Sequence, residues 1–167
     1  MNMPALIKFD EALRAASQNE LVAAVAAFRE VAERWPTDDL ADDALYNLGA
    51  CYLAMSQFIH AQAIFEDVIK TYPNATLDAA NGRTETGRTA AKAWLGLVSA
   101  HLGQGNLAAA EAAGAKLVDY PDSKITPPSG PERSFHDIAG ALLSAARHES
   151  EPEAETVSPA DIIADAT

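Results

Sequence analysis

The chain has few basic residues, one cysteine and no long apolar run. Its 167 residues include 12 Lys and Arg against 24 Asp and Glu, a formal net charge of −12. Contacts with nucleic-acid phosphates need clustered Lys and Arg, so we expect no nucleic-acid partner and favour a protein or peptide partner with a basic surface. Cys51 stands alone and cannot form an intramolecular disulfide, which suits a small core residue. No stretch approaches the roughly 18 apolar residues of a membrane-spanning helix, so we expect no membrane insertion.

Sequence signatures of catalysis and of bound cofactors are missing as well. No Gly-rich phosphate loop follows a strand pattern, no G-x-S-x-G occurs, and Cys51 has no catalytic signature beside it. The four histidines form no H-x-x-x-H pair, which argues against a zinc site. The aspartates between positions 38 and 43 lack the spacing of a calcium loop and suit the positive end of a helix. We therefore expect no enzyme, no cofactor and no metal site.

The chain has a strong helical pattern instead. Alanine dominates an apolar fraction of 49%, and runs of β-branched residues are missing, which predicts an all-α fold. Apolar residues recur with the spacing of one helix face, and Gly, Pro and polar clusters separate the segments. The predicted helices span about 4–17, 20–34, 39–55, 58–71, 87–103, 106–119 and 134–147.

A 28-residue pattern occurs three times, over residues 9–36, 46–73 and 94–121. Each copy begins with an aromatic residue and ends with an aromatic residue followed by proline. Self-similarity at this spacing is typical of repeat proteins, in which each unit stacks on the next. Such proteins usually act through the extended surface that stacking creates.

The spacing between the copies is uneven. Pro36 and Pro73 are 37 residues apart, whereas Pro73 and Pro121 are 48 residues apart. The added residues lie in the polar segment 74–88, which contains two glycines. Insertions in repeat arrays map to surface loops, often near the binding face, so we expect such a loop here.

A capping helix is predicted after the third copy. Beyond the irregular, proline-containing stretch 122–133, Ser134 and Asp137 have the spacing of a capping box at the start of helix 134–147. This helix is predicted to close the last core face of the array, because its apolar residues form one stripe: Phe135, Ile138, Ala139, Leu142, Leu143 and Ala146. We therefore expect one helical domain over residues 1–147.

An acidic tail follows the predicted domain. Residues 149–167 contain six carboxylates and no Lys or Arg, so half of the net charge lies in the segment 148–167, which we expect to be disordered. Its apolar cluster at 159–164 can dock on a partner or on the protein's own groove, or it can be inert. If Met1 is the native start, the lack of an export signal predicts a cytoplasmic location.

The second copy, counted from Asp42 as its first position, contains Leu45, Leu48, Gly49, Tyr52, Ala61, Phe65 and Pro73. In these signature positions it resembles the tetratricopeptide repeat. The first copy matches through Ala24, Phe28 and Pro36, and in the third Ala113 replaces the aromatic residue. The resemblance covers about residues 5–121 and implies a right-handed α-solenoid of three helix-turn-helix repeats, at about 5–36, 39–73 and 87–121, with a capping helix. The aromatic–proline endings are similar to those of bacterial envelope proteins, such as the periplasmic coordinator of the Tol-Pal system and the outer-membrane assembly lipoproteins.

In this family, ligands usually lie along the concave surface formed by the first helix of each repeat. The resemblance implies groove positions at Asp43, Tyr46, Asn47, Ala50, Leu53 and Ala54, with Phe9, Leu13, Lys92 and His101 on the neighbouring walls. Tyr46 and Leu53 can equally be core residues between repeats. A carboxylate clamp around Asn47 is not expected, because the flanking copies lack the Lys, Asn and Arg residues that it needs.

These features together predict a non-catalytic adaptor or scaffold that binds a peptide or helix of a partner protein in its groove. Two alternatives stay open. One is a self-assembling structural component of a larger complex. The other is a small secretion-type chaperone for a client protein, which the size and acidity of the chain resemble.

Overall fold

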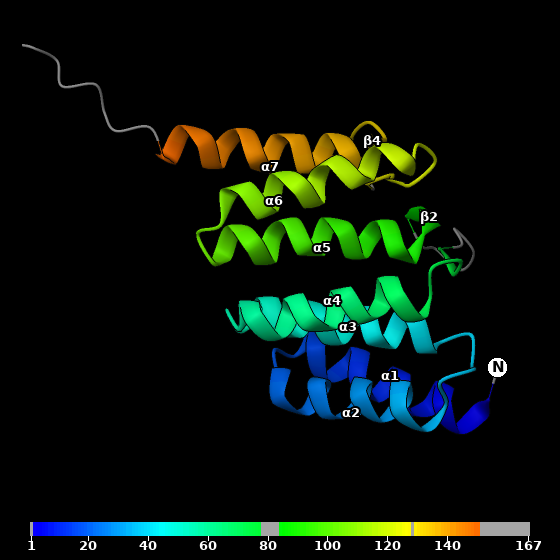
Figure 1. The fold of residues 1–167 in the computed structure, drawn as a ribbon. Helices are drawn as coiled ribbons and strands as arrows, with labels where there is room; N and C mark the ends of the chain where they lie inside the picture. Colours follow the sequence, from blue (N-terminus) through cyan, green and yellow to red (C-terminus); the bar gives the residue numbers. More distant parts are fainter. Residues whose placement is uncertain (1, 78–83, 128, 151–167) are drawn as a thin grey trace, which may run out of the picture.

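The protein is a stack of antiparallel helix pairs. The computed structural model describes residues 2–77, 84–127 and 129–150. Its helices stack in chain order, from α1 and α2 at one end to α7 at the other (Figure 1). Their bounds are α1 Met3–Ser17, α2 Leu21–Arg34, α3 Ala41–Ala54, α4 Phe58–Thr71, α5 Thr89–Gly103, α6 Leu107–Ala115, which the 3₁₀ turn η2 Lys116–Asp119 extends, and α7 Phe135–Ser150. This arrangement confirms the predicted all-α solenoid.

The turn inside each helix pair has the same geometry in all three repeats. One residue in each turn adopts the left-handed conformation: Asn19, Ser56 and Gly105, with φ of 60°, 57° and 71°. The amide of the residue that follows then donates to a carbonyl oxygen five positions back, as Gln57 N–H does to Tyr52 O at 2.8 Å. This 6→1 bond satisfies a carbonyl that the helix end leaves without a partner.

The aromatic–proline endings also share one conformation. Trp35, Tyr72 and Tyr120 have φ of −131°, −123° and −125° and ψ of 56°, 51° and 59°. Each of these residues precedes a proline, whose ring disfavours the helical region for the residue before it. The 28-residue sequence pattern is therefore a repeat of structure as well as of residue type.

The core is continuous through the stack. Phe28 and Phe65 are almost completely buried. The Phe65 ring on α4 lies between Gly49 of α3 and Gly96 of α5, and at both glycines an added Cβ atom would approach it to 2.6 Å. A single aromatic ring therefore packs the second repeat against the first helix of the third.

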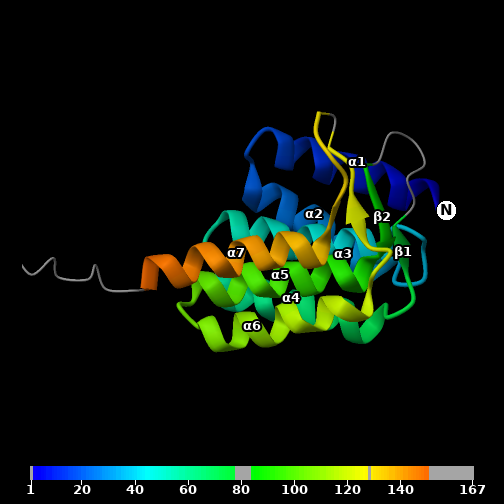
Figure 2. The same cartoon turned by 90° about the horizontal axis from the view of Figure 1, so that it is seen from above.

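Four short strands add a small antiparallel sheet that the sequence analysis did not predict. Strands β1 Thr76–Leu77, β2 Glu85–Arg88, β3 Lys124–Ile125 and β4 Arg133–Ser134 lie in that order. The sheet stands at one end of the helices, next to the start of α5 (Figure 2). The insertion 74–88 and the stretch 122–133 are thus paired with each other instead of forming separate loops, while residues 78–83 lie outside the described part.

Close packing fixes the join between these two segments. Gly87 has a φ of +111°, and a Cβ atom there would lie 2.5 Å from the backbone of Ser123. The buried Ser123 accepts a hydrogen bond at its Oγ from the amide of Arg88, at 3.1 Å. Only glycine combines this backbone conformation with this close approach.

Helix α7 closes the stack as predicted, with one difference in its apolar stripe. Its capping residue Ser134 accepts a hydrogen bond at Oγ from Asp137 N–H at 3.0 Å. Ala139 and Leu143 are buried against α5 and α6, whereas Leu142, expected in the same stripe, is 38% exposed. The helix runs to Ser150, past the predicted end at 147, and the remaining tail with its cluster at 159–164 lies outside the described residues.

Candidate functional site

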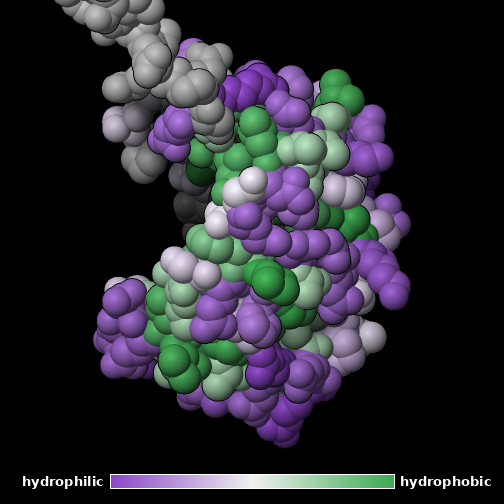
Figure 3. Space-filling model, turned by 60° about the vertical axis from the view of Figure 1, so that its left-hand side comes forward, coloured by the Kyte–Doolittle hydropathy of each residue, from purple (hydrophilic) through white to green (hydrophobic). Residues whose placement is uncertain are grey.

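Half of the ten predicted groove residues come together in one pocket. A pocket of about 270 Å³ lies between α1, α3, α5 and β2. Its lining consists of Phe9, Leu13, Asp43, Asn47, Thr84, Glu85 and Lys92. The first helix of each repeat contributes to it, and five of these residues are among those predicted from the sequence. In the space-filling view the molecule is hollowed on its left side, about midway along the stack (Figure 3).

Lys92 connects the wall of this pocket to the core. Its ammonium group pairs with Glu85 of β2 and lies 4.3 Å from the centroid of the Tyr46 ring. The Tyr46 ring in turn packs on Phe65, with centroids 5.5 Å apart. Burial, with a smaller effect from the Glu85 charge, raises the pKa of the Tyr46 phenol. The inserted segment is therefore tied to α5 and α3 at the edge of the pocket.

Thr84 and Glu85 are pocket residues that the sequence analysis did not name. The sequence indicated only that the polar insertion 74–88, which contains them, would lie near the binding face. Which of its residues would face the groove depends on the pairing of β2 with β3, with Glu85 opposite Ile125. The two strands lie on either side of α5 and α6 in the sequence, so local sequence patterns cannot predict their pairing.

Asn47 is held by its own helix. Its Nδ2 donates a hydrogen bond to the backbone oxygen of Asp43 at 2.8 Å, one turn earlier in α3. Both side chains are half-buried and line the pocket. The amide is therefore oriented by the backbone, with one of its N–H groups already engaged.

The remaining predicted positions on α3 lie outside this pocket. Tyr46 and Leu53 are half-buried and pack against the hydrophobic core. This agrees with the alternative interpretation of both residues as part of the core between repeats. Ala50 is half-buried and Ala54 is exposed.

His101 lies apart from the other predicted residues. It lines a second pocket of about 370 Å³ between α4, α5 and α6, together with Trp94 and Leu97. Its Nδ1 atom is buried and makes no hydrogen bond within the described part of the chain. Lys92 and His101 are nine residues apart on α5, and nine steps of about 100° place them on opposite faces of the helix. His101 therefore faces α4 and α6 and not the wall next to Lys92.

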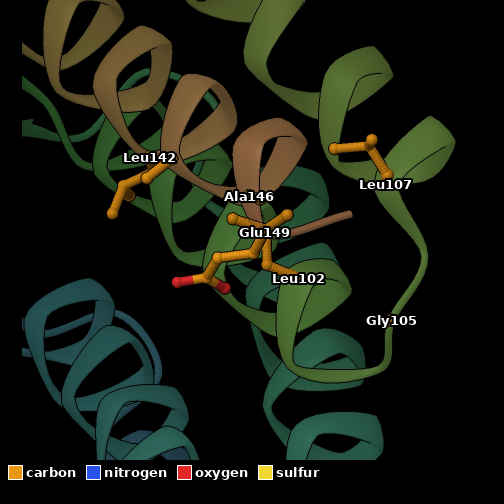
Figure 4. Close-up of a pocket in the computed structure, with 7 residues that line it drawn as sticks. Leu102, Gly105, Leu107, Leu142, Ala146 and Glu149 are labelled. Carbon is orange, nitrogen blue, oxygen red and sulfur yellow. The ribbon is translucent and has the colours of Figure 1, made fainter. Parts of the chain in front are cut away.

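A third pocket, of about 480 Å³, lies where α5, α6 and α7 meet. Its lining is Leu102, Gly105, Leu107, Leu142, Ala145, Ala146 and Glu149 (Figure 4). In this view Leu142 and Glu149 extend from α7 on the side away from α6. The predicted capping helix therefore presents apolar surface of its own as well as closing the core.

The described residues show little else of chemical note. Cys51 is buried, and burial raises the pKa of its thiol. In this part of the chain, no three His, Cys, Asp or Glu side chains gather in a way that could hold a metal ion. None of the helices described has the length and apolar content needed to cross a bilayer.

Comparison with protein families identifies the second repeat. The family model of the tetratricopeptide repeat matches residues 43–75. This span covers almost all of α3 and the whole of α4, the repeat whose signature residues are most complete. A search of curated proteins finds no match to the chain. Tetratricopeptide repeats generally mediate protein–protein interactions and are typically non-catalytic.

Proposed function

We propose that this protein is a non-catalytic adaptor that binds a peptide or helix of a partner protein on its concave face. The observation that carries the proposal is the pocket lined by Phe9, Asp43 and Lys92, because it draws on the first helix of all three repeats. A site assembled from successive repeats is how stacked arrays create an extended binding surface.

The lining of the pocket points to the chemistry of the partner. Phe9 and Leu13 form an apolar wall, and Leu13 is 42% exposed. Asp43 and Glu85 add two carboxylates to the same lining, and the ammonium of Lys92 pairs with Glu85. An apolar side chain next to a basic one complements this lining, and charge complementarity mainly sets specificity and association rate.

The test compares two exposed apolar residues in affinity purification of the full chain followed by mass spectrometry. Leu13→Asp places a charge in the pocket, whereas Val22→Asp places the same charge on α2, where Val22 is 78% exposed. We expect a partner that is lost with Leu13→Asp and kept with Val22→Asp, while circular dichroism shows both variants folded. Identical recovery by both variants would contradict the proposal. Recovery of one unfolded client that depends on Leu13 would support the chaperone alternative instead.

Self-association is a second candidate, favoured by the first helix of the stack. Met3 and Ile7 of α1, one turn apart, are 66% and 55% exposed. Exposed apolar side chains on the end helix of an array are suited to packing against another array. Light scattering over a concentration series should show association that Ile7→Asp removes and Val22→Asp preserves. A monomer at every concentration would exclude this candidate.

The aromatic–proline endings also suggest an origin. We infer from them a relationship to the repeats of bacterial envelope proteins, including the Tol-Pal coordinator. The support is the residue pattern itself, since each repeat ends in an aromatic residue followed by proline at Trp35, Tyr72 and Tyr120. Neighbouring genes that encode envelope components would favour this relationship, and neighbours of an unrelated pathway would count against it.

A further inference from the structure

The pocket at the last helix is apolar and open. Leu102, Leu107 and Leu142 come from three different helices, and Glu149 is its only charged residue. Leu142 is 38% exposed although it belongs to the apolar stripe of α7. In a longer array a further helix would cover such a surface, because each repeat buries the face of the one before it.

The chain itself supplies a candidate occupant next to this pocket. Glu149 lines the pocket, and α7 ends one residue later at Ser150. The following residues 151–157 span up to about 23 Å when extended, at about 3.3 Å each, which is close to the length of the 16-residue α7. Residues 158–166 can therefore reach every part of the pocket. They contain Ile162 and Ile163, the only adjacent pair of large apolar residues after Ser150.

The charges around the pocket suit the segment that leads to it. Residues 151–157 carry three glutamates and no basic residue. The last turn of α7 carries His148 and Arg147, whose guanidinium pairs with Glu111 of α6 at 2.7 Å, and the first turn of α6 contains no acidic residue. The N-terminus of a helix is a centre of partial positive charge that favours nearby anions. A path from Ser150 past the start of α6 therefore places the glutamates next to positive charge.

We propose that residues 158–166 bind in this pocket of the same molecule, with Ile162 and Ile163 against Leu102, Leu107 and Leu142. Tethering by a linker of this length gives an effective concentration of about the millimolar range. An intrinsic dissociation constant of about 1 mM is therefore enough for about half of the molecules to hold the segment in the pocket. This inference is independent of the proposed partner groove between α1, α3 and β2.

Amide NMR spectra of the full chain test the proposal. The double variant Ile162→Asp and Ile163→Asp should shift the amide signals of Leu102, Gly105 and Leu107, because the tail no longer binds in the pocket. The matched control, Ala154→Asp with Val157→Asp, adds the same charge outside the segment and should leave these signals near their original positions. Unchanged signals in the isoleucine variant overturn the proposal, and so do equal shifts in both variants.

A change in the pocket provides the second measurement. Ala145→Glu puts a carboxylate into the pocket, and Ala141→Glu puts one on the same helix at an exposed position outside it. The signals of Ile162 and Ile163 should move with the first substitution and not with the second. The shifts should also be independent of protein concentration. Shifts that grow with concentration and accompany dimer formation in light scattering would assign the pocket to a second copy and overturn the intramolecular arrangement.

Discussion

Gly→Ala substitution should destabilise the protein at Gly49, next to the Phe65 ring, and stabilise it at Gly140 of α7. The Phe65 ring lies against Gly49 of α3 on one side and Gly96 of α5 on the other. A Cβ atom at Gly49 would come 2.6 Å from Cε1 of the ring, well inside van der Waals contact. The ring cannot retreat, because Gly96 is equally close on the opposite side. Gly49→Ala must therefore overpack the core, whereas Gly140→Ala on α7 meets no atom within 4 Å.

Two opposing effects set the magnitude. Overpacking a core costs about 1–3 kcal/mol, while alanine stabilises a helix relative to glycine by about 1 kcal/mol. Because the ring is fixed on both faces, we expect the upper part of the packing cost and a net loss of about 1–2 kcal/mol for Gly49→Ala. Gly140→Ala involves only the second effect and should gain up to about 1 kcal/mol.

Urea unfolding of the full-length variants, followed by circular dichroism, measures both values. In thermal unfolding, each 1 kcal/mol corresponds to about 2–4 °C in Tm for a chain of this size. The reasoning is refuted if Gly49→Ala is as stable as Gly140→Ala. A further check combines Gly49→Ala with Phe65→Leu. The smaller side chain should recover part of the loss, since residues in contact give non-additive effects.

Two further predictions concern buried titratable groups. Burial raises the pKa of Asp42, whose Oδ2 accepts a hydrogen bond from Thr89 Oγ1 at 2.6 Å. Because the pKa is raised in the folded protein, the ionised carboxylate lowers the free energy of unfolding at pH values above that pKa. Below about pH 4 the carboxyl group is protonated in the folded and the unfolded state, so this destabilisation vanishes. Asp42→Asn, which keeps an acceptor for Thr89, should therefore be more stable than the parent at pH 7, with an advantage that shrinks towards pH 4; no advantage at pH 7 would contradict this. Cys51 should react with a thiol reagent at pH 8 only after unfolding in urea, and rapid labelling of the native protein would show that its burial is transient.

Helix limits and turns were predictable because local residues determine them. The helix expected at 58–71 is Phe58–Thr71, and that expected at 87–103 is Thr89–Gly103. Prolines stop the second helix of each repeat, and a residue that tolerates positive φ ends the first. Ser56 shows the limit of this reasoning, since a serine at that position is not a strong turn signal by itself, yet its φ of 57° matches that of Asn19 and Gly105 in the other turns.

The small sheet could not be predicted from the same kind of pattern. Its strands have two to four residues, too few to show a period of two. Glu85 pairs with Ile125 across the whole of α5 and α6, so the pairing depends on how the third repeat stacks. The composition of the pocket depends on it too, because Thr84 and Glu85 reach the pocket only through this pairing. The sequence therefore indicated that the insertion would matter for the groove without indicating which residues would face it.

The alanine-rich third repeat has a structural reason that only the packing reveals. In the second repeat Phe65 fills the space between helices, whereas the third has Ala113 and Gly114 at the corresponding part of α6. At Gly114 an added Cβ atom would lie 3.0 Å from a methyl group of Leu143 of α7. The capping helix thus fills the space that a bulky residue would otherwise occupy. Helix α7 can approach this closely only because the residues of α6 are small. The departure of the third copy from the repeat pattern is therefore what allows the capping helix to pack.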